Sequence, residues 1–279
     1  MLVTILVENS AINNLGCEHG LSILVEYNGK KYLVDTGSSG LFAENASEMG
    51  VNLADVEGGF LSHAHYDHSG GYKEFFEVNK SAKIYLQRAA SEKYYYKILG
   101  PVKKYIGIPQ EILETYADRF EYVDGYRDFG NGIYILPHTT AGLASRGEHA
   151  HMYAVSDGKT TVDEFKHEQT VVFDTKDGLV LFNSCSHGGV ENIIEEVKKV
   201  FPGRKIKAFF GGFHMMGALG TSTSGFSEKE VKAVAWQLTN SSEAVFYSGH
   251  CTGEVAFKWL SEEMGERIVA FSTGMVIEI

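Results

Sequence analysis

LSHAHYDHSGG, residues 61–71, places three histidines and one aspartate within six consecutive positions. The apolar residues just before the first histidine predict a short buried strand over 59–62. His63 and His65 are two residues apart, so both rings project to the same side as the chain leaves that strand. Asp67 and His68 follow in a tight turn, because the two glycines after Ser69 favour neither strand nor helix. The spacing predicts a metal-binding cluster.

Nitrogen ligands with one carboxylate suit zinc, or iron or manganese in a two-metal centre. Calcium and magnesium prefer cages made of oxygen atoms alone. The alternative is a surface loop that is rich in histidine for no functional reason. Four ligand side chains at this spacing have no simple packing purpose, so we favour the metal site.

Three further strand-like apolar runs also end in a histidine, at His187, His214 and His250. In α/β architectures, ligands gather at the carboxyl ends of strands, where small residues let the backbone turn sharply. Each histidine alone could be an ordinary strand-end residue. Together with His63 they predict one convergent site.

Length and composition indicate one folded domain over residues 1–279. The chain is 44% hydrophobic and contains no low-complexity linker that would divide it. No segment approaches the roughly 20 apolar residues of a membrane span. The first residues enter a strand pattern without a basic signal-peptide region. We therefore expect a soluble, cytoplasmic protein that does not associate with membranes.

The formal net charge is −11, from 25 basic and 36 acidic residues, and the basic residues are scattered. Such a chain repels duplex nucleic acid unless a local groove reverses the field. We expect a small-molecule substrate and no nucleic-acid partner. No pattern in the sequence indicates the oligomeric state.

The three cysteines are odd in number and widely spaced, which argues against a disulfide framework. Cys185 lies two residues before His187, and Cys251 directly follows His250. Either thiol could be a metal ligand, a neighbour of a ligand or a redox-sensitive group. Packing as a small buried residue is the simpler interpretation of both.

Periodicity predicts two sheets packed together with helices outside them. The segment 138–168 is polar and irregular, and we interpret it as a lid over the site. Strands are expected at Leu2–Glu8, Ser22–Tyr27, Lys31–Asp35, Ile84–Leu86, Ile133–Leu136, Thr170–Phe173 and Leu179–Phe182, with an Asn28-Gly29 hairpin turn. Helices are expected at Leu41–Met49, Tyr72–Val78, Ala89–Tyr105, Val190–Val200, Glu228–Leu238 and Glu254–Glu263.

Residues 63–68 match the HxHxDH signature of the metallo-β-lactamase superfamily, and Asp35-Thr36-Gly37 matches its DTG turn. Residues 18–22, 183–189, 211–214 and 249–253 resemble the branch of the dihydropterin ribofuranosyl-aminobenzene phosphate synthases and their bacterial relatives. The resemblance runs over essentially the whole chain. It implies an α/β (α+β) fold, a four-layer αββα sandwich with a binuclear metal centre at one edge of the sheets.

The resemblance also implies a ligand set. His63, His65 and a later histidine would hold the first of two divalent ions, with zinc favoured over iron or manganese. Asp67, His68 and His250 would hold the second, and His187 is the remaining ligand. His187 stands about where the superfamily has a bridging aspartate, and the usual third-histidine region offers His138, His149 and His151. Asp35 is interpreted as a carboxylate that orients a ligand histidine.

Two such cations activate water and polarise a phosphoryl or carbonyl oxygen, so hydrolysis is the expected chemistry. Asp67 would orient the water and shuttle a proton, and His214 would contact the substrate or protonate a leaving group. The resemblance adds His19 as a substrate contact. It also indicates a phosphorylated or pterin-like substrate and a hydrolase or a synthase of that branch. The alternatives are a general phosphodiesterase, lactonase or thioesterase, and a metal-binding redox sensor without turnover.

Overall fold

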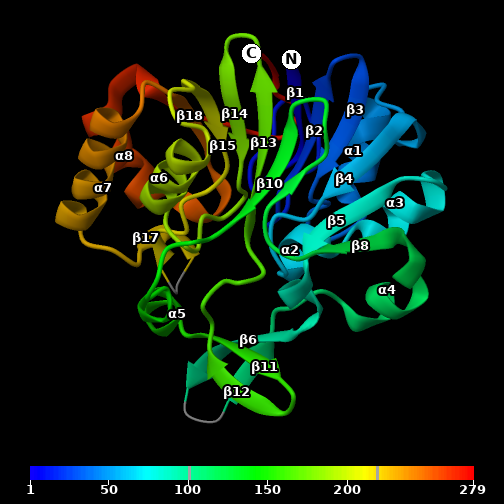
Figure 1. Ribbon diagram of the computed structural model, residues 1–279, viewed down its shortest axis with the longest axis horizontal. Coiled ribbons are helices and arrows are strands. Elements are labelled where there is room, and N and C mark those ends of the chain that lie inside the picture. Colours follow the sequence, from blue (N-terminus) through cyan, green and yellow to red (C-terminus); the bar gives the residue numbers. More distant parts are fainter. Residues whose placement is uncertain (100–101, 218–219) are drawn as a thin grey trace.

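The computed structural model describes residues 1–99, 102–217 and 220–279. Two seven-stranded sheets face each other (Figure 1). The first has the order β20 (Val276–Glu278), β1 (Leu2–Val7), β2 (Ser22–Tyr27), β3 (Lys30–Val34), β4 (Val56–Phe60), β5 (Lys83–Gln87) and β8 (Phe120–Val123). The second has the order β19 (Ile268–Ala270), β18 (Val245–Ser248), β15 (Ile206–Phe210), β14 (Gly178–Phe182), β13 (Gln169–Thr175), β10 (Ile133–Pro137) and β9 (Arg127–Asp128).

Helices cover the outer face of each sheet (Figure 1). On the first sheet these include α1 (Leu41–Glu48), α3 (Tyr72–Val78) and α4 (Gln110–Thr115); on the second they are α6 (Val190–Val200), α7 (Glu228–Ser241) and α8 (Glu254–Met264). Two shorter helices, α2 (Tyr66–Ser69) and α5 (Ala144–His149), lie nearer the site. Five single-turn 3-10 helices span Leu53–Asp55, Arg88–Ser91, Ala117–Arg119, His250–Thr252 and Gly265–Arg267.

Three buried apolar clusters separate these layers. One lies between the sheets, where Ile23 and Phe60 of the first sheet share a cluster with Phe173 and Phe210 of the second. The other two lie between each sheet and its helices. The expected αββα sandwich is therefore confirmed.

Local sequence signals explain several element ends. Asn28 and Gly29 form the expected two-residue turn between β2 and β3, both with positive φ, as a type I′ turn requires. Helix α7 begins with a capping box in which Ser227 accepts from the Glu230 backbone N–H and the Glu230 carboxylate accepts from the Ser227 backbone N–H.

The helix expected over Ala89–Tyr105 is wrong. Strands β6 (Lys93–Leu99) and β7 (Val102–Tyr105) occupy most of this segment, and residues 100–101 lie outside the described residues. Tyrosine favours strands, and alternation buries Tyr94 while its neighbours remain partly exposed. The helical interpretation failed because an unbroken run of aromatic residues is compatible with both the 3.6-residue period of a helix and the two-residue period of a strand.

The segment 138–168 is also more regular than expected. It contains α5 and the hairpin of β11 (Met152–Ser156) and β12 (Lys159–Val162). These strands join β6 and β7 in a four-stranded sheet of order β12-β11-β6-β7, which projects from the sandwich at the bottom of Figure 1. A two-stranded sheet, β16 (Met216–Gly217) with β17 (Gly220–Ser224), lies beside α8.

Parallel pairing brings the functional loops to one edge. Strand β4 runs parallel to β3 and β5, and β14, β15 and β18 are parallel to one another. Their carboxyl ends therefore lead into loops on the same side of each sheet. Within the described ranges, no helix is both long enough and apolar enough to cross a membrane.

Candidate metal centre

The loop after β4 is held against the loop after β3 by a close backbone approach. A Cβ atom on Gly70 would lie 2.0 Å from the Ser38 carbonyl oxygen, and one on Gly71 would lie 2.6 Å from that of Thr36. Both glycines have negative φ, at −65° and −90°. They are therefore needed for proximity, and the turn expected from their flexibility is instead the junction of α2 and α3.

Asp35 orients the start of the histidine cluster through Ser62 and His68. Its carboxylate accepts from the Ser62 backbone N–H at 2.7 Å and from the Ser62 hydroxyl at 2.6 Å. The same carboxylate lies 2.8 Å from His68 Nδ1. Because Ser62 donates its hydroxyl hydrogen to Asp35, the 2.8 Å contact with His63 Nδ1 has the imidazole as donor. Both rings thus direct Nε2 away from Asp35.

The first ligand set consists of His63, His65 and His187. The ring centroids lie 4.6 to 4.9 Å apart. Nε2 of His63, Nε2 of His65 and both ring nitrogens of His187 are buried without a hydrogen-bond partner among the described residues. Buried polar atoms are nearly always hydrogen-bonded, so converging orphaned nitrogens fit a metal ion.

Burial keeps this set uncharged. It lowers the pKa of all three imidazoles, to about 3 for His65, and neighbouring histidines lower it further. Neutral imidazole is the form that binds metals. The donor atoms and their uncharged state therefore both fit a transition-metal ion such as zinc.

The second ligand set consists of Asp67, His68 and His250. Nε2 of His68 lies 3.2 Å from Nε2 of His250, and Asp67 Oδ2 lies 3.5 Å from each of these nitrogens. Asn9 Oδ1 is 3.0 Å from His250 Nδ1 and accepts a hydrogen bond from it. All three donor atoms therefore point at one another.

Unlike the first set, this one holds charge. Burial opposes protonation of His68, but Asp67 and Asp35 outweigh it and raise its pKa to about 10. Burial likewise opposes ionisation of Asp67, yet His68, His19 and His250 hold the pKa of its carboxyl well below the usual range. A metal ion would take the place of the proton that this set now holds.

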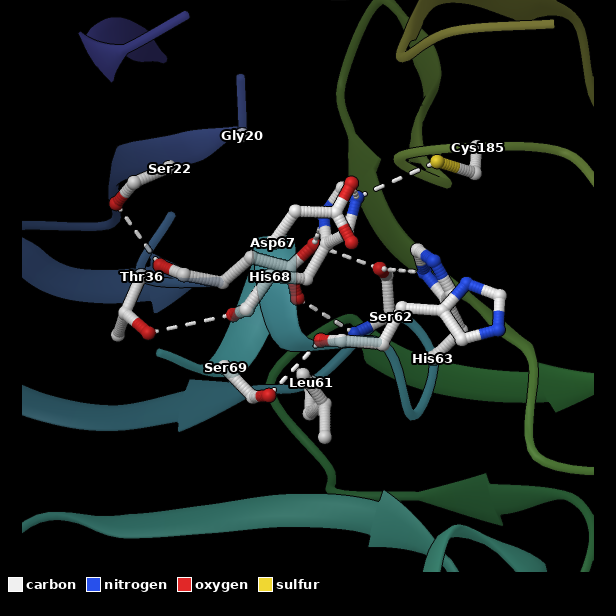
Figure 2. Close-up of polar contacts among 12 residues, drawn as sticks. Gly20, Ser22, Thr36, Leu61, Ser62, His63, Asp67, His68, Ser69 and Cys185 are labelled. Carbon is white, nitrogen blue, oxygen red and sulfur yellow. Dashed lines mark hydrogen bonds and ion pairs between the residues drawn. The ribbon is translucent and has the colours of Figure 1, made fainter. Parts of the chain in front are cut away.

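Cys185 is shared between the two sets. Its sulfur lies 3.3 Å from His68 Nε2, as Figure 2 shows. It forms a potential metal-binding group with His63 and His187, and another with His68 and His250. His187 was expected near the position of the bridging aspartate; in the structure the Cys185 thiol lies between the two candidate sets. The signal that could have found it is its place as the third residue after β14.

A second cysteine adjoins this position. Cys251 Sγ lies 3.3 Å from Cys185 Sγ, and both thiols are free and buried. Burial raises the pKa of the Cys185 thiol, and the neighbouring Cys251 raises it further. A coordinating metal ion would deprotonate it.

His138 belongs to a buried ion pair next to the first set. Its ring lies between Glu168 and Glu196, whose carboxylates outweigh burial and raise its pKa to about 9. Glu168 also accepts from the backbone N–H groups of His187 at 2.8 Å and of Gly188 at 2.9 Å. Both ring nitrogens of His138 are paired with these carboxylates, so His138 positions the His187 loop and leaves no nitrogen free to bind a metal. This role depends on two carboxylates that the sequence pattern did not single out.

The other histidines of the third-histidine region lie outside both sets. His149 Nε2 contacts the Gly225 carbonyl at 3.1 Å, and His151 is exposed. His167, by contrast, is fully buried in a segment that resembles a solvated loop in sequence. Its Nδ1 accepts from the Ala64 N–H at 3.0 Å, so Nε2 donates to Asp163 at 3.0 Å. This contact supports the chain between His63 and His65.

The two expected substrate contacts lie on opposite sides of the centre. The His214 ring is 4.1 Å from that of His187, and its Nδ1 is buried without a partner among the described residues. His19 Nε2 lies 3.3 Å from Asp67 Oδ2, and its ring stacks on His250 at 4.8 Å. The hydrogen bond to Asp67 raises the pKa of His19.

A cavity of about 320 Å³ opens beside His187 and His214. Phe165, Phe213 and Phe226 supply apolar surface, and Arg146 and His149 supply nitrogens. Arg146 also forms an ion pair with the Glu191 carboxylate. Four residues of helix α5 and its C-terminal end, together with Phe165, form one side of the cavity, all from the segment interpreted as a lid: Ser145, Arg146, His149 and Ala150.

The family model of the metallo-beta-lactamase superfamily matches residues 15–162. The chain belongs to this superfamily. It is 28% identical to an uncharacterized protein of Methanocaldococcus jannaschii, over 94% of both chains. It is 24% identical to the 7,8-dihydropterin-6-methyl-4-(beta-D-ribofuranosyl)-aminobenzene-5'-phosphate synthase of the same organism, over 94% of this chain and 90% of that one.

A solved metallo-beta-lactamase relative agrees over the whole length. The crystal structure of Tm1679, a metal-dependent hydrolase of the beta-lactamase superfamily, has a TM-score of 0.83 and 27% identity. The match covers 100% of this chain and 99% of that one. The two ligand sets therefore lie in a fold whose members include metal-dependent hydrolases.

Proposed function

We propose that this protein is a hydrolase that uses two divalent metal ions, with zinc preferred, on a small phosphorylated molecule that carries a flat ring. The observation that supports it best is the placement of Cys185 between two complete ligand sets. Bound ions of this kind supply Lewis acidity and lower the pKa of water toward neutrality.

The residues around the centre have separate roles in this proposal. Asp67 orients the attacking water and accepts its proton, and His19 relays that proton to solvent from the site's exposed side. His214 faces the cavity, where it donates a hydrogen bond to the substrate or protonates the leaving group. Arg146 and His149 bind the anionic group, while the phenylalanines contact the ring.

The synthase relative supports the substrate class. Its name describes a product that combines a pterin ring with a phosphorylated sugar, and both parts suit the cavity's aromatic and cationic surfaces. At 24% identity, the same centre could instead catalyse a synthase reaction of that branch. General lactonase or thioesterase activity would need no cationic group, so Arg146 in the cavity wall favours the phosphorylated substrate.

Metal reconstitution tests the proposal. The chelator-treated protein should hydrolyse none of a panel of chromogenic phosphodiesters, lactones and thioesters. Added zinc should restore turnover of phosphodiesters first, and manganese or iron should restore less. Arg146→Met should lose phosphodiester turnover, whereas His151→Ala, at an exposed histidine, should retain it. Full metal occupancy without turnover of any panel member would contradict hydrolysis.

The adjacent thiols favour one further candidate, a redox sensor. Peroxide could oxidise Cys185 and Cys251 to a disulfide, with both thiol hydrogens and the peroxide forming two molecules of water, because the sulfurs are 3.3 Å apart. This bond would remove Cys185 from both metal sets. Metal release on oxidation, lost in Cys251→Ser, would support the sensor; release that persists in this variant would contradict it.

A further inference from the structure

The four-stranded sheet β12-β11-β6-β7 differs in charge from the rest of the protein. Its strands contain five lysines and neither aspartate nor glutamate. Removing these five from the chain's 25 basic residues leaves 20, against 36 acidic residues. A basic sheet therefore projects from a strongly acidic body (Figure 1).

The inner face of this sheet packs against the sandwich. Tyr94, Met152 and Ala154 are buried in the core cluster that includes the first sheet's helices. The ring of Tyr94 lies 4.1 Å from that of His167 and 6.4 Å from that of His65. The inner face thus supports the metal centre, and the opposite face points away from it.

The outer face presents a row of tyrosines. Tyr95 pairs directly with Tyr153 on β11 and with Tyr105 on β7, so the three rings cross three strands in one register. Side chains directly opposite in a sheet lie on the same face. Each of the three tyrosines is half-buried, which leaves ring surface accessible.

Exposed lysines flank this row. Lys93 and Lys97 lie two residues on either side of Tyr95 and so share its face. Lys103 Nζ lies 4.1 Å from the centroid of the Tyr95 ring, and Lys97 Nζ lies 5.4 Å from that of Tyr153. None of the three lysines forms a salt bridge with another described residue. We call Tyr95, Tyr105, Tyr153, Lys93, Lys97 and Lys103 the outer tyrosine face.

We propose that the outer tyrosine face binds single-stranded nucleic acid. Aromatic rings that stack on bases, combined with lysines that contact phosphates, are the combination found in proteins that bind single strands. A four-stranded sheet with aromatic side chains on one face is also a known platform for RNA bases. The tyrosine rings take the bases, and Lys93, Lys97 and Lys103 take the phosphates beside them.

Charge and composition favour this ligand over others. A duplex buries its bases and would bring many phosphates near the acidic body, whereas a single strand can follow the basic sheet alone. Lysine is depleted in protein interfaces, which disfavours a protein partner. The net charge of −11 suggested no nucleic-acid partner, but Lys93, Lys97 and Lys103 give this one sheet face a local positive charge.

Fluorescence anisotropy with the intact protein tests the proposal. The probes are labelled oligouridine and oligodeoxythymidine of about 12 nucleotides, in about 50 mM salt. We expect saturable binding that weakens with salt, with a slope of log affinity against log salt of about −2 for three lysine contacts. Tyr153→Leu should weaken binding about fivefold or more, whereas Tyr153→Phe should retain it because stacking needs only the ring.

Charge-matched variants provide the control. Lys97→Glu with Lys103→Glu should abolish most binding, whereas Lys229→Glu with Lys258→Glu, at exposed lysines of α7 and α8, should leave it nearly unchanged. Circular dichroism establishes that each variant is folded. The proposal is overturned if the wild type does not bind, if the control pair loses as much affinity, or if a duplex or phosphatidylserine vesicles bind more tightly.

Discussion

The two ligand sets share Cys185 but are prepared for metal in opposite ways. His63, His65 and His187 are neutral because burial lowers their pKa, and their free nitrogens have no partner among the described residues. The second set is internally hydrogen-bonded, and the carboxylates of Asp67 and Asp35 raise the pKa of His68 to about 10. The first set thus has buried nitrogens without hydrogen-bond partners, and the second set carries a proton on His68. The first should bind metal more readily at neutral pH.

The largest expected effect comes from the first set. His65→Ala removes one of three preformed nitrogens, and activity should fall more than about 100-fold, beyond the loss typical of residues that only orient ligands. Metal analysis should show that the tighter of the two ions is lost. His151→Ala is the matched control. If only the weaker ion were lost, the first set would be the one with the lower metal affinity, contrary to this prediction.

The next effect tests the shared position. Cys185→Ser should weaken both ions and reduce activity by about 100-fold, because the shared thiolate serves both sets. Cys185→Asp should retain much of the wild-type metal affinity and activity, since a carboxylate can also bridge two ions. In the cobalt-substituted wild type, a near-ultraviolet sulfur-to-metal absorption band should appear and be absent in Cys185→Asp. Cys17→Ser, at an exposed thiol, should change nothing.

Proton release sharpens the contrast further. Below its pKa of about 10, His68 must lose a proton before it binds metal, so affinity of the second set should rise with pH by up to about tenfold per unit. The first set, with the pKa of His65 at about 3, should show little change above about pH 6.

Titration calorimetry in buffers of different ionisation enthalpy measures this difference. The Cys185→Asp protein is used so that no thiol proton contributes. The first equivalent of zinc should release almost no proton and the second about one. Release of the same number of protons in both binding steps would contradict the proposed difference in protonation between the two sets.

His19 should give the smallest effect. Its side chain is 42% exposed, so its contact with Asp67 is weakened by solvent. His19→Ala should lower kcat/KM only about two- to fivefold, chiefly by slowing proton transfer. Steady-state kinetics beside His151→Ala measures this. A loss above about 100-fold, with one ion released, would instead make His19 a metal ligand.

Much of the candidate centre followed from sequence because strand-end patterns are local. An apolar run that ends in a small residue and a histidine indicates where a chain leaves a sheet, and four such runs predicted that His63, His187, His214 and His250 would converge. The structure brings all four to one edge. The HxHxDH motif similarly predicted Asp67 and His68 beside them.

The remaining features depend on partners that are distant in sequence. In sequence, Cys185 resembled a small packing residue. In the structure, the loop after β14 places its thiol between the two sets. His138 resembled a ligand, but the Glu168 and Glu196 carboxylates enclose it. The segment Ala89–Tyr105 resembled a helix because nothing local indicated that β6 would pair with β11.

The sequence by itself determined the superfamily, the sandwich and the residue types of the metal centre, because periodicity and short-range spacing depend only on the covalent chain. The tertiary structure decided which donor lies between the two sets and which histidines hold protons. Those properties depend on burial and on charges brought together across the fold, and neither quantity exists until the chain has folded.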